Sequence, residues 1–80
     1  MKDYIATFFT HYDAMQFKRA LEKKGGSGQL TPVPRWLSSS CGTCVRFKLD
    51  PEHIQALDTE NVELIVSVDG DAHEDIVDNR

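Results

Sequence analysis

The sequence predicts a single α+β domain, and three observations lead to this fold class. Four short segments alternate apolar and polar residues as strands do, and two others have the three-to-four spacing of a helix. The order of these segments is strand, helix, strand, strand, helix, strand. A chain of 80 residues buries one small core, so a surface site is expected rather than a deep, enclosed pocket.

The first strand is predicted over Asp3 to Phe9, where β-branched and aromatic side chains alternate. Thr10 and Asp13 then form a capping box, which predicts the start of a helix. Gly25-Gly26 ends this helix, because glycine adopts the left-handed cap conformation without steric cost. The apolar side of the helix carries Ala14, Phe17 and Leu21.

The second strand is predicted over Gln29 to Val33, and it should lie at a sheet edge because Pro32 has no N–H to donate. A polar loop, Arg35 to Gly42, leads into the third strand. Alternation along that strand separates Val45, Phe47 and Leu49 on one face from Cys44, Arg46 and Lys48 on the other.

Asp50-Pro51 predicts a second, short helix, since aspartate caps helices and proline fits their first position. The fourth strand follows with apolar residues at period two: Val62, Leu64, Val66 and Val68. We expect one domain over residues 1–69, with the cysteine loop at 35–44. Residues 70–80 are acidic and without periodicity, so we expect a frayed tail that lies away from this loop.

The β-α-β-β-α-β order most simply forms a ferredoxin-like fold, in which a four-stranded antiparallel sheet has both helices on one face. In this topology the first strand and the connection between the second and third strands end at the same edge. The cysteine loop should therefore lie beside the amino end of the first helix, near Thr10, His11 and Tyr12.

Cys41 is the main candidate for chemistry, because it follows three serines and precedes a glycine in a loop too polar for the core. An ordinary buried cysteine is the alternative. Arg35 and a helix amino terminus would favour the reactive thiolate, and serine hydroxyls and loop amides would form a nest for small anions. The predicted binding residues are Arg35, Ser38, Ser39, Ser40, Gly42 and His11.

Cys44 completes a C-x-x-C motif and has two interpretations: a resolving thiol for Cys41, or a residue that fills space on the strand. Along an extended strand the two cysteines would be roughly 10 Å apart, so a disulfide requires the chain to turn at Gly42. Two cysteines are half of a structural zinc site, and we expect no metal and no cofactor.

Other classes of function are disfavoured. No catalytic Ser/His/Asp pattern and no phosphate-binding glycine motif occurs, so we expect no enzyme. The net charge of −4 and the lack of a Gly-Phe signature argue against nucleic-acid binding. No apolar run is long enough to span a membrane and Met1 leads directly into a strand, so we expect a cytoplasmic protein with reduced thiols.

The loop also carries a resemblance to a known family. Pro32-Val33-Pro34-Arg35, then Ser38-Ser39-Ser40 and Cys41-Gly42, are similar to the hallmark of the selenium/sulfur carrier-like proteins. The resemblance covers roughly residues 3 to 68. It implies that Cys41 holds sulfur or selenium, as a persulfide or selenenyl sulfide, between donor and acceptor proteins.

Two departures from that family pattern keep other functions open: the second thiol, Cys44, and the acidic extension. One alternative is a small dithiol redox or metal-binding protein. The other is a non-catalytic interaction or regulatory module that forms a homodimer through its sheet and uses Trp36 as a contact.

Overall fold

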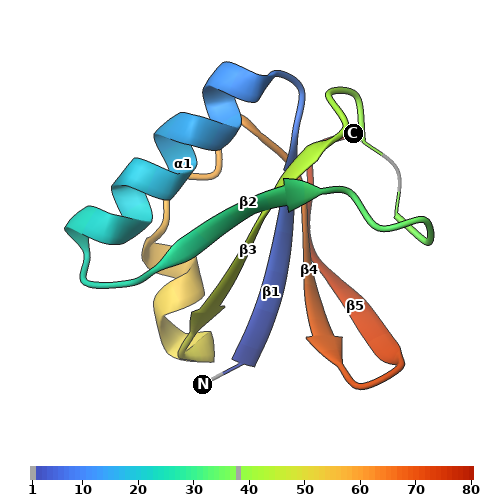
Figure 1. Ribbon diagram of the computed structural model, residues 1–80. Helices are drawn as coiled ribbons and strands as arrows, with labels where there is room; N and C mark the ends of the chain where they lie inside the picture. The colour runs from blue at the N-terminus through green and yellow to red at the C-terminus, as the bar shows by residue number, and fades with distance from the viewer. Residues whose placement is uncertain (1, 38) are drawn as a thin grey trace.

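In a computed structural model of the protein, which describes residues 2–37 and 39–80, five strands form one antiparallel sheet (Figure 1). The strand order is β2-β3-β1-β4-β5. The α+β class and the antiparallel sheet are therefore confirmed. The elements are β1 (Lys2–Phe8), α1 (His11–Lys23), β2 (Gly28–Pro32), β3 (Thr43–Leu49), the 3₁₀ helix η1 (Pro51–Ala56), β4 (Val62–Asp69) and β5 (Ala72–Asp78).

The predicted four-stranded, ferredoxin-like sheet is wrong in its number of strands, because the acidic segment expected to fray is β5. It pairs with β4 from Ala72 opposite Asp69 to Asp78 opposite Leu64. Gly70, with a φ of +60°, allows the tight turn between them. The physical reason is that β4 without a neighbour would expose a row of unpaired backbone groups, which β5 satisfies whatever its side chains are.

The position expected for the acidic segment is also wrong. Because β5 runs antiparallel to β4, it returns the chain to the end of the sheet where β4 begins. The backbone N–H of Asn79 donates to the carbonyl of Glu63 over 2.9 Å. The carboxyl end of the chain therefore lies at the same end of the sheet as the cysteine loop, as Figure 1 shows.

Helix α1 begins and ends as predicted. The Thr10 hydroxyl accepts the N–H of Asp13 over 3.2 Å, and it donates to the carboxylate of the same residue over 2.8 Å. Gly25 follows the helix with a φ of +84°. The buried side of α1 consists of Ala14, Phe17 and Leu21.

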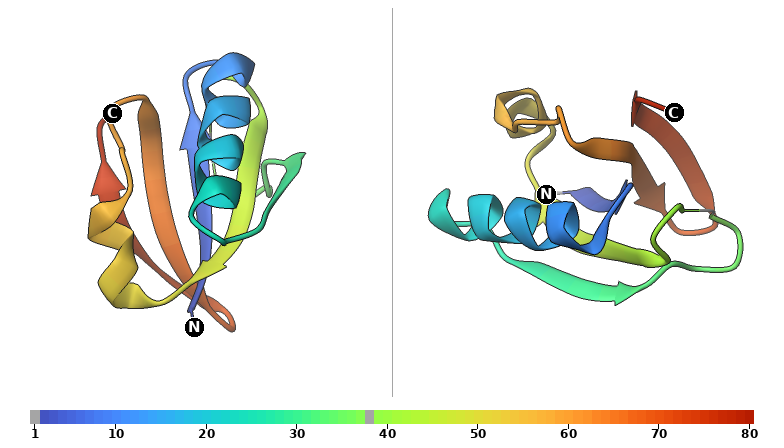
Figure 2. Two further views of the ribbon diagram at one scale, coloured as in Figure 1. Left: turned by 90° about the vertical axis from the view of Figure 1, so that its left-hand side faces the viewer. Right: turned by 90° about the horizontal axis from the view of Figure 1, so that it is seen from above.

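The second helix is a short 3₁₀ helix, η1, which starts at Pro51 as predicted. Its buried residue Ile54 and the following Leu57 belong to the same core cluster as the apolar side of α1. Figure 2 shows both helices on one side of the sheet. We call this side the helix face and the opposite side the open face.

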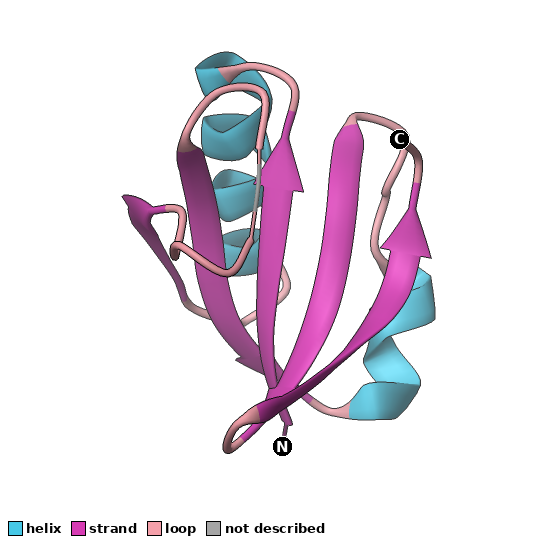
Figure 3. Ribbon diagram, turned by 90° about the vertical axis from the view of Figure 1, so that its right-hand side faces the viewer, coloured by secondary structure: helices cyan, strands magenta, loops and turns pink. Residues whose placement is uncertain are grey.

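The two faces have separate apolar clusters. The helix-face cluster includes Tyr4, Phe8, Phe17, Val45, Phe47, Val62 and Ile65. The open-face cluster is smaller and consists of Ile5, Cys44, Leu64 and Val66, with Val33, Leu37 and Val68 packed against it. The loop between β2 and β3 supplies part of this second cluster, and Figure 3 shows that loop crossing in front of the open face.

A β-bulge interrupts the predicted period of β4. Thr7 pairs with Leu64 and the next residue of β1, Phe8, pairs with Val62, so Glu63 is an extra residue in β4. Val62 consequently packs in the helix-face cluster, whereas Leu64 packs in the open-face cluster. The bulge occurs beside the cysteine loop and turns Glu63 towards it.

Candidate functional site

The β2–β3 loop, described over residues 33–37 and 39–42, is closed at its base by the N–H of Val33, which donates to the carbonyl of Gly42 over 3.1 Å. Gly42 has a φ of +74°, a conformation that strongly favours glycine. At the far part of the loop, the N–H of Leu37 donates to the carbonyl of Pro34 over 3.0 Å. The glycine after Cys41 therefore provides the turn expected of it.

Ser39 joins the loop to the turn between β1 and α1. Its hydroxyl donates to the carbonyl of Phe8 over 3.2 Å, and Phe8 lies two residues before the helix cap Thr10. The same hydroxyl accepts the N–H of Cys41 over 3.4 Å. The expected position of the loop, near the amino end of α1, is confirmed.

Cys41 is a free, half-buried thiol that packs against the helix-face cluster. Its Sγ–H donates to the carbonyl of Thr43 over 3.3 Å, and its Sγ lies 3.9 Å from the hydroxyl oxygen of Ser39. The residue is thus partly exposed, and its thiol is oriented by Ser39 of the loop and by Thr43, the first residue of β3. This combination suits a thiol that reacts with a small reagent or with a partner's sulfur atom.

Glu63 lies beneath the loop and is only 5% exposed. Its carboxylate accepts three hydrogen bonds: from the Thr7 hydroxyl over 3.1 Å, from the Ser40 N–H over 3.3 Å and from the Ser40 hydroxyl over 2.6 Å. An oxygen-to-oxygen distance this short is typical of a hydroxyl bonded to an ionised carboxylate. Glu63 therefore connects β1, β4 and the residue directly before Cys41.

Two opposing effects act on the pKa of Glu63. Burial raises it, because water no longer stabilises the charged form, but the hydrogen bonds from Ser40 and Thr7 together lower it more. The pKa of Glu63 is therefore held below its ordinary value, and the carboxylate is ionised at neutral pH. The buried charge beneath the cysteine loop, that of Glu63, is therefore negative.

This finding bears on the expected nest for external anions at Ser40, whereas binding of such anions by the loop stays a prediction. Both donors of Ser40, its N–H and its hydroxyl, already bind the carboxylate of Glu63. The loop does form the predicted kind of anion site at this residue, but an anion of the protein itself occupies it. Ser38 lies outside the described residues.

The expected positive surroundings of Cys41 are not found among the contacts of the described residues. Arg35 is exposed in the turn at the far part of the loop, and no described hydrogen bond or ion pair joins it to Cys41. His11 is exposed at the start of α1, and within residues 2–37 and 39–80 it has no described hydrogen bond to the loop. The roles of both residues remain predictions.

Cys44 is completely buried, on the face opposite to Cys41. Its sulfur lies 3.2 Å from the Thr31 hydroxyl and 3.7 Å from the carbonyl of Pro32, which accepts its S–H. The face was predicted correctly, together with Arg46 and Lys48. Cys44 is buried on that face because Val33 and Leu37 of the β2–β3 loop pack against the cluster to which it belongs.

Trp36 and His73 are in ring contact, with centroids 4.6 Å apart. Trp36 is nevertheless 49% exposed. Both residues line a cavity of about 460 Å³ on the open face, together with Ile5, Pro34, Arg46, Val68, Gly70, Asp71 and Ala72. The indole is therefore half-exposed at the edge of a cavity.

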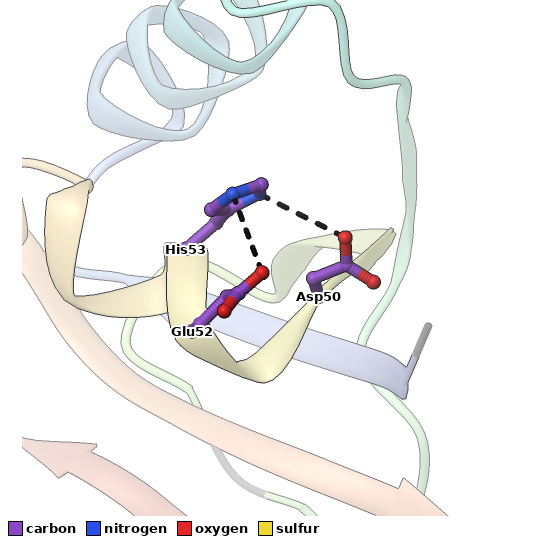
Figure 4. Close-up of side chains that lie close together, drawn as sticks. All are labelled: Asp50, Glu52 and His53. Carbon is purple, nitrogen blue, oxygen red and sulfur yellow. Dashed lines mark ion pairs between the residues drawn. The ribbon is translucent and has the colours of Figure 1, made fainter.

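Asp50, Glu52 and His53 form a second group of polar side chains (Figure 4). The two His53 nitrogens lie 4.0 Å from an Asp50 oxygen and 3.9 Å from a Glu52 oxygen, and side-chain atoms of all three lie within 4.8 Å of one another. This group follows the carboxyl end of β3, whereas Cys41 lies before its amino end. It therefore takes no part in the cysteine site.

Glu63 is the site residue that sequence reasoning missed. The available signal is a glutamate flanked on both sides by apolar residues, in the segment Val62-Glu63-Leu64-Ile65-Val66. A charged side chain is rarely buried in a strand unless it has partners. Its partners, Thr7 and Ser40, are far away in the sequence, so only the folded chain identifies them.

The comparisons with known proteins identify one family. Within the described residues, no helix is long and apolar enough to cross a membrane. No curated protein and no solved structure shows a significant match to the chain. The family model described as "Putative Se/S carrier protein-like" matches residues 3–64, a range that includes the whole cysteine loop and Glu63. Because the match covers more than half of the 80 residues, the chain belongs to this Se/S carrier protein-like family.

Proposed function

We propose that this protein carries sulfur or selenium on Cys41 and delivers it to a partner protein in the cytoplasm. The observation that supports this most is the contrast between the two thiols. Cys41 is free and half-buried, in a loop that lies within the family match, whereas Cys44 is completely buried. One partly exposed thiol beside an enclosed one fits a carrier that transfers a group through a single sulfur atom.

The loading step requires only thiol exchange. The Cys41 thiolate attacks the outer sulfur of a donor persulfide, the S–S bond of the donor breaks, and the donor leaves as a thiolate. The product is a persulfide on Cys41, and no external oxidant or reductant is consumed. A donor with selenium in the outer position reacts in the same way and leaves a selenenyl sulfide on Cys41.

Delivery is the reverse exchange with a nucleophile of the acceptor. In the described structure the Cys44 sulfur lies on the other face of the sheet and cannot attack a group on Cys41. This arrangement favours a carrier that keeps its cargo until an acceptor approaches. The dithiol alternative would require the loop to open before Cys44 could reach the outer chalcogen.

The test is to load the purified, reduced protein with glutathione persulfide and to locate the added sulfur by peptide mass spectrometry. We expect one sulfur atom on Cys41. The variant Cys41→Ser should not be loaded, and the matched variant Cys44→Ala should be loaded as the unmodified protein is. Loading of Cys44, or no loading of a Cys41 that reacts readily with iodoacetamide, would contradict the proposal.

A second candidate function, a non-catalytic interaction module, is favoured by Trp36. A half-exposed indole beside a cavity is a common anchor for a protein partner, and a second copy of this chain is the simplest one. Sedimentation equilibrium of the protein and of Trp36→Ala tests it. A dimer that Trp36→Ala abolishes and Cys41→Ser leaves intact would support this function over carriage.

A further inference from the structure

Glu63 is a buried carboxylate that the proposed thiol exchange does not use. No ion pair joins it to a basic side chain within residues 2–37 and 39–80. The charge of Arg80 lies near enough to interact with Glu63, but the direct partners of the carboxylate are the hydrogen-bond donors of Thr7 and Ser40. A buried charge of this kind destabilises a protein unless its hydrogen-bond partners are in place. A neutral or apolar residue in this position of β4 would avoid that cost, so the carboxylate requires an explanation.

The partners of Glu63 indicate its role. Two of its three hydrogen bonds come from Ser40, whose carbonyl group is joined directly to the nitrogen of Cys41. The N–H of Cys41 in turn donates to Ser39, which is held by the carbonyl of Phe8. The segment before the thiol is thus attached at two points, to β4 through Ser40 and to the end of β1 through Ser39.

These attachments determine the orientation of the thiol. With Ser39 and Ser40 held, Cys41 packs against the helix-face cluster and donates its S–H to the carbonyl of Thr43. Without the Ser40 attachment, the hydrogen bonds that hold the described part of the loop near Cys41 would be those of Ser39 to Phe8, of Cys41 to Thr43 and of Val33 to Gly42. The thiol would then spend more of its time outside its half-buried position.

We propose that Glu63 is the positioning residue of Cys41: its carboxylate fills the anion nest at Ser40 from inside the protein and holds the thiol in its half-buried orientation. The importance of this position for carriage rests on the proposed function. The attachment itself is a property of the loop and can be measured without any sulfur transfer.

The experiment measures how fast iodoacetamide alkylates Cys41, with peptide mass spectrometry to separate Cys41 from Cys44. Removing a hydrogen bond to a charged group should make loop opening, and therefore alkylation, about tenfold faster in Glu63→Ala and in Ser40→Ala. Amide hydrogen exchange at Cys41 and Gly42 should accelerate by a similar factor, while exchange in the centre of β1 stays unchanged. The matched control is Glu60→Gln, an exposed carboxylate nearby in sequence, which should alkylate at the unmodified rate.

A rescue experiment separates positioning from a general loss of stability. Glu63→Ala leaves space for a small carboxylate at the donors of Thr7 and Ser40, so formate should slow alkylation of this variant towards the original rate. Formate should not affect the unmodified protein or Ser40→Ala, and chloride at equal ionic strength should not replace it. A general loss of stability would not respond to formate in this selective way.

The outcomes distinguish this inference from the proposed function. If folded Glu63→Ala and Ser40→Ala alkylate at the unmodified rate, Glu63 does not position Cys41, whether or not Cys41 carries sulfur. If both variants alkylate faster but Cys41 accepts no sulfur from glutathione persulfide, the positioning role stands and carriage fails. If Glu63→Ala does not fold, Ser40→Ala decides the question, because it removes the 2.6 Å bond from the exposed partner.

Discussion

Cys41 and Cys44 lie on opposite sides of the sheet, although only two residues separate them in the sequence. The turn at Gly42 ends the loop, and β3 then begins with alternating side-chain directions. Cys41 consequently packs towards α1, while Cys44 packs under the β2–β3 loop with Ile5 and Leu64. The two cysteines of the C-x-x-C motif therefore lie in different environments.

The first prediction concerns thiol accessibility. In the native protein a thiol-specific disulfide reagent should react quickly with Cys41 and only after unfolding with Cys44, which has no exposed surface. Under mild oxidation the native protein should not form a disulfide between them. Thiol titration with and without denaturant measures the difference. If both thiols reacted with the reagent at the same rate in the native protein, the loop would not cover Cys44 in solution.

The second prediction is that Cys44→Ala destabilises the fold. Its side chain is completely buried in the open-face cluster, so truncation removes apolar contacts and leaves a small cavity. The expected loss is about 1–3 kcal/mol of unfolding free energy, measured by urea denaturation. Cys41→Ala is the matched control: it should cost less, because Cys41 is only half-buried. Equal and negligible losses would mean that Cys44 is not packed.

The third prediction concerns pH and Glu63. Because its pKa is lower in the folded chain than its ordinary value, the unfolded chain takes up the proton first as the pH falls. The stability that Glu63 contributes is therefore complete above a pH of about 4.5 and is lost as the pH falls through the lower, folded pKa. Glu63→Gln should lose less stability than the unmodified protein on acidification below this pH.

Urea denaturation at a series of pH values checks this, with Glu60→Gln as the control. Glu60 is exposed, and its replacement should leave the slope of stability against pH unchanged. Asp78 keeps some acid sensitivity in every variant, since hydrogen bonds from Arg80 lower the pKa of Asp78. The informative quantity is thus the difference between the curves. If the unfolding free energy of Glu63→Gln and of the unmodified protein changed with pH in parallel, the lowered pKa of Glu63 in the folded chain would be contradicted.

The fourth prediction is that residues 72–80 are part of the folded domain. Truncation after Asp71 would remove β5, expose the backbone edge of β4 and leave Val62 without the Asn79 side chain, which donates to its carbonyl over 2.9 Å. We expect a lower melting temperature and a tendency to aggregate through the new edge. Circular dichroism and light scattering measure both. An unchanged melting temperature would support the frayed tail expected from the sequence.

The elements that could be predicted from the sequence are those with local causes. Thr10 and Asp13 define the start of α1, Gly25 its end, and Pro51 the start of η1, because caps and left-handed glycines act within a few residues. The alternation in β3 separates Cys44 from Val45 correctly. The loop between Pro32 and Gly42 identified the candidate site and the family.

The remaining features depend on contacts between distant residues. The sequence 72–78 has no strand alternation, and β5 exists because β4 offers unpaired backbone groups. Glu63 becomes a site residue only because a bulge turns it towards Thr7 and Ser40, which lie 56 and 23 positions away. Cys44 is buried by a loop that folds back over the open face. By itself, then, the sequence determined the local elements and the reactive loop, whereas the tertiary structure decided which side chains are buried and which charge lies beneath Cys41, because burial and hydrogen bonding depend on neighbours that only folding brings together.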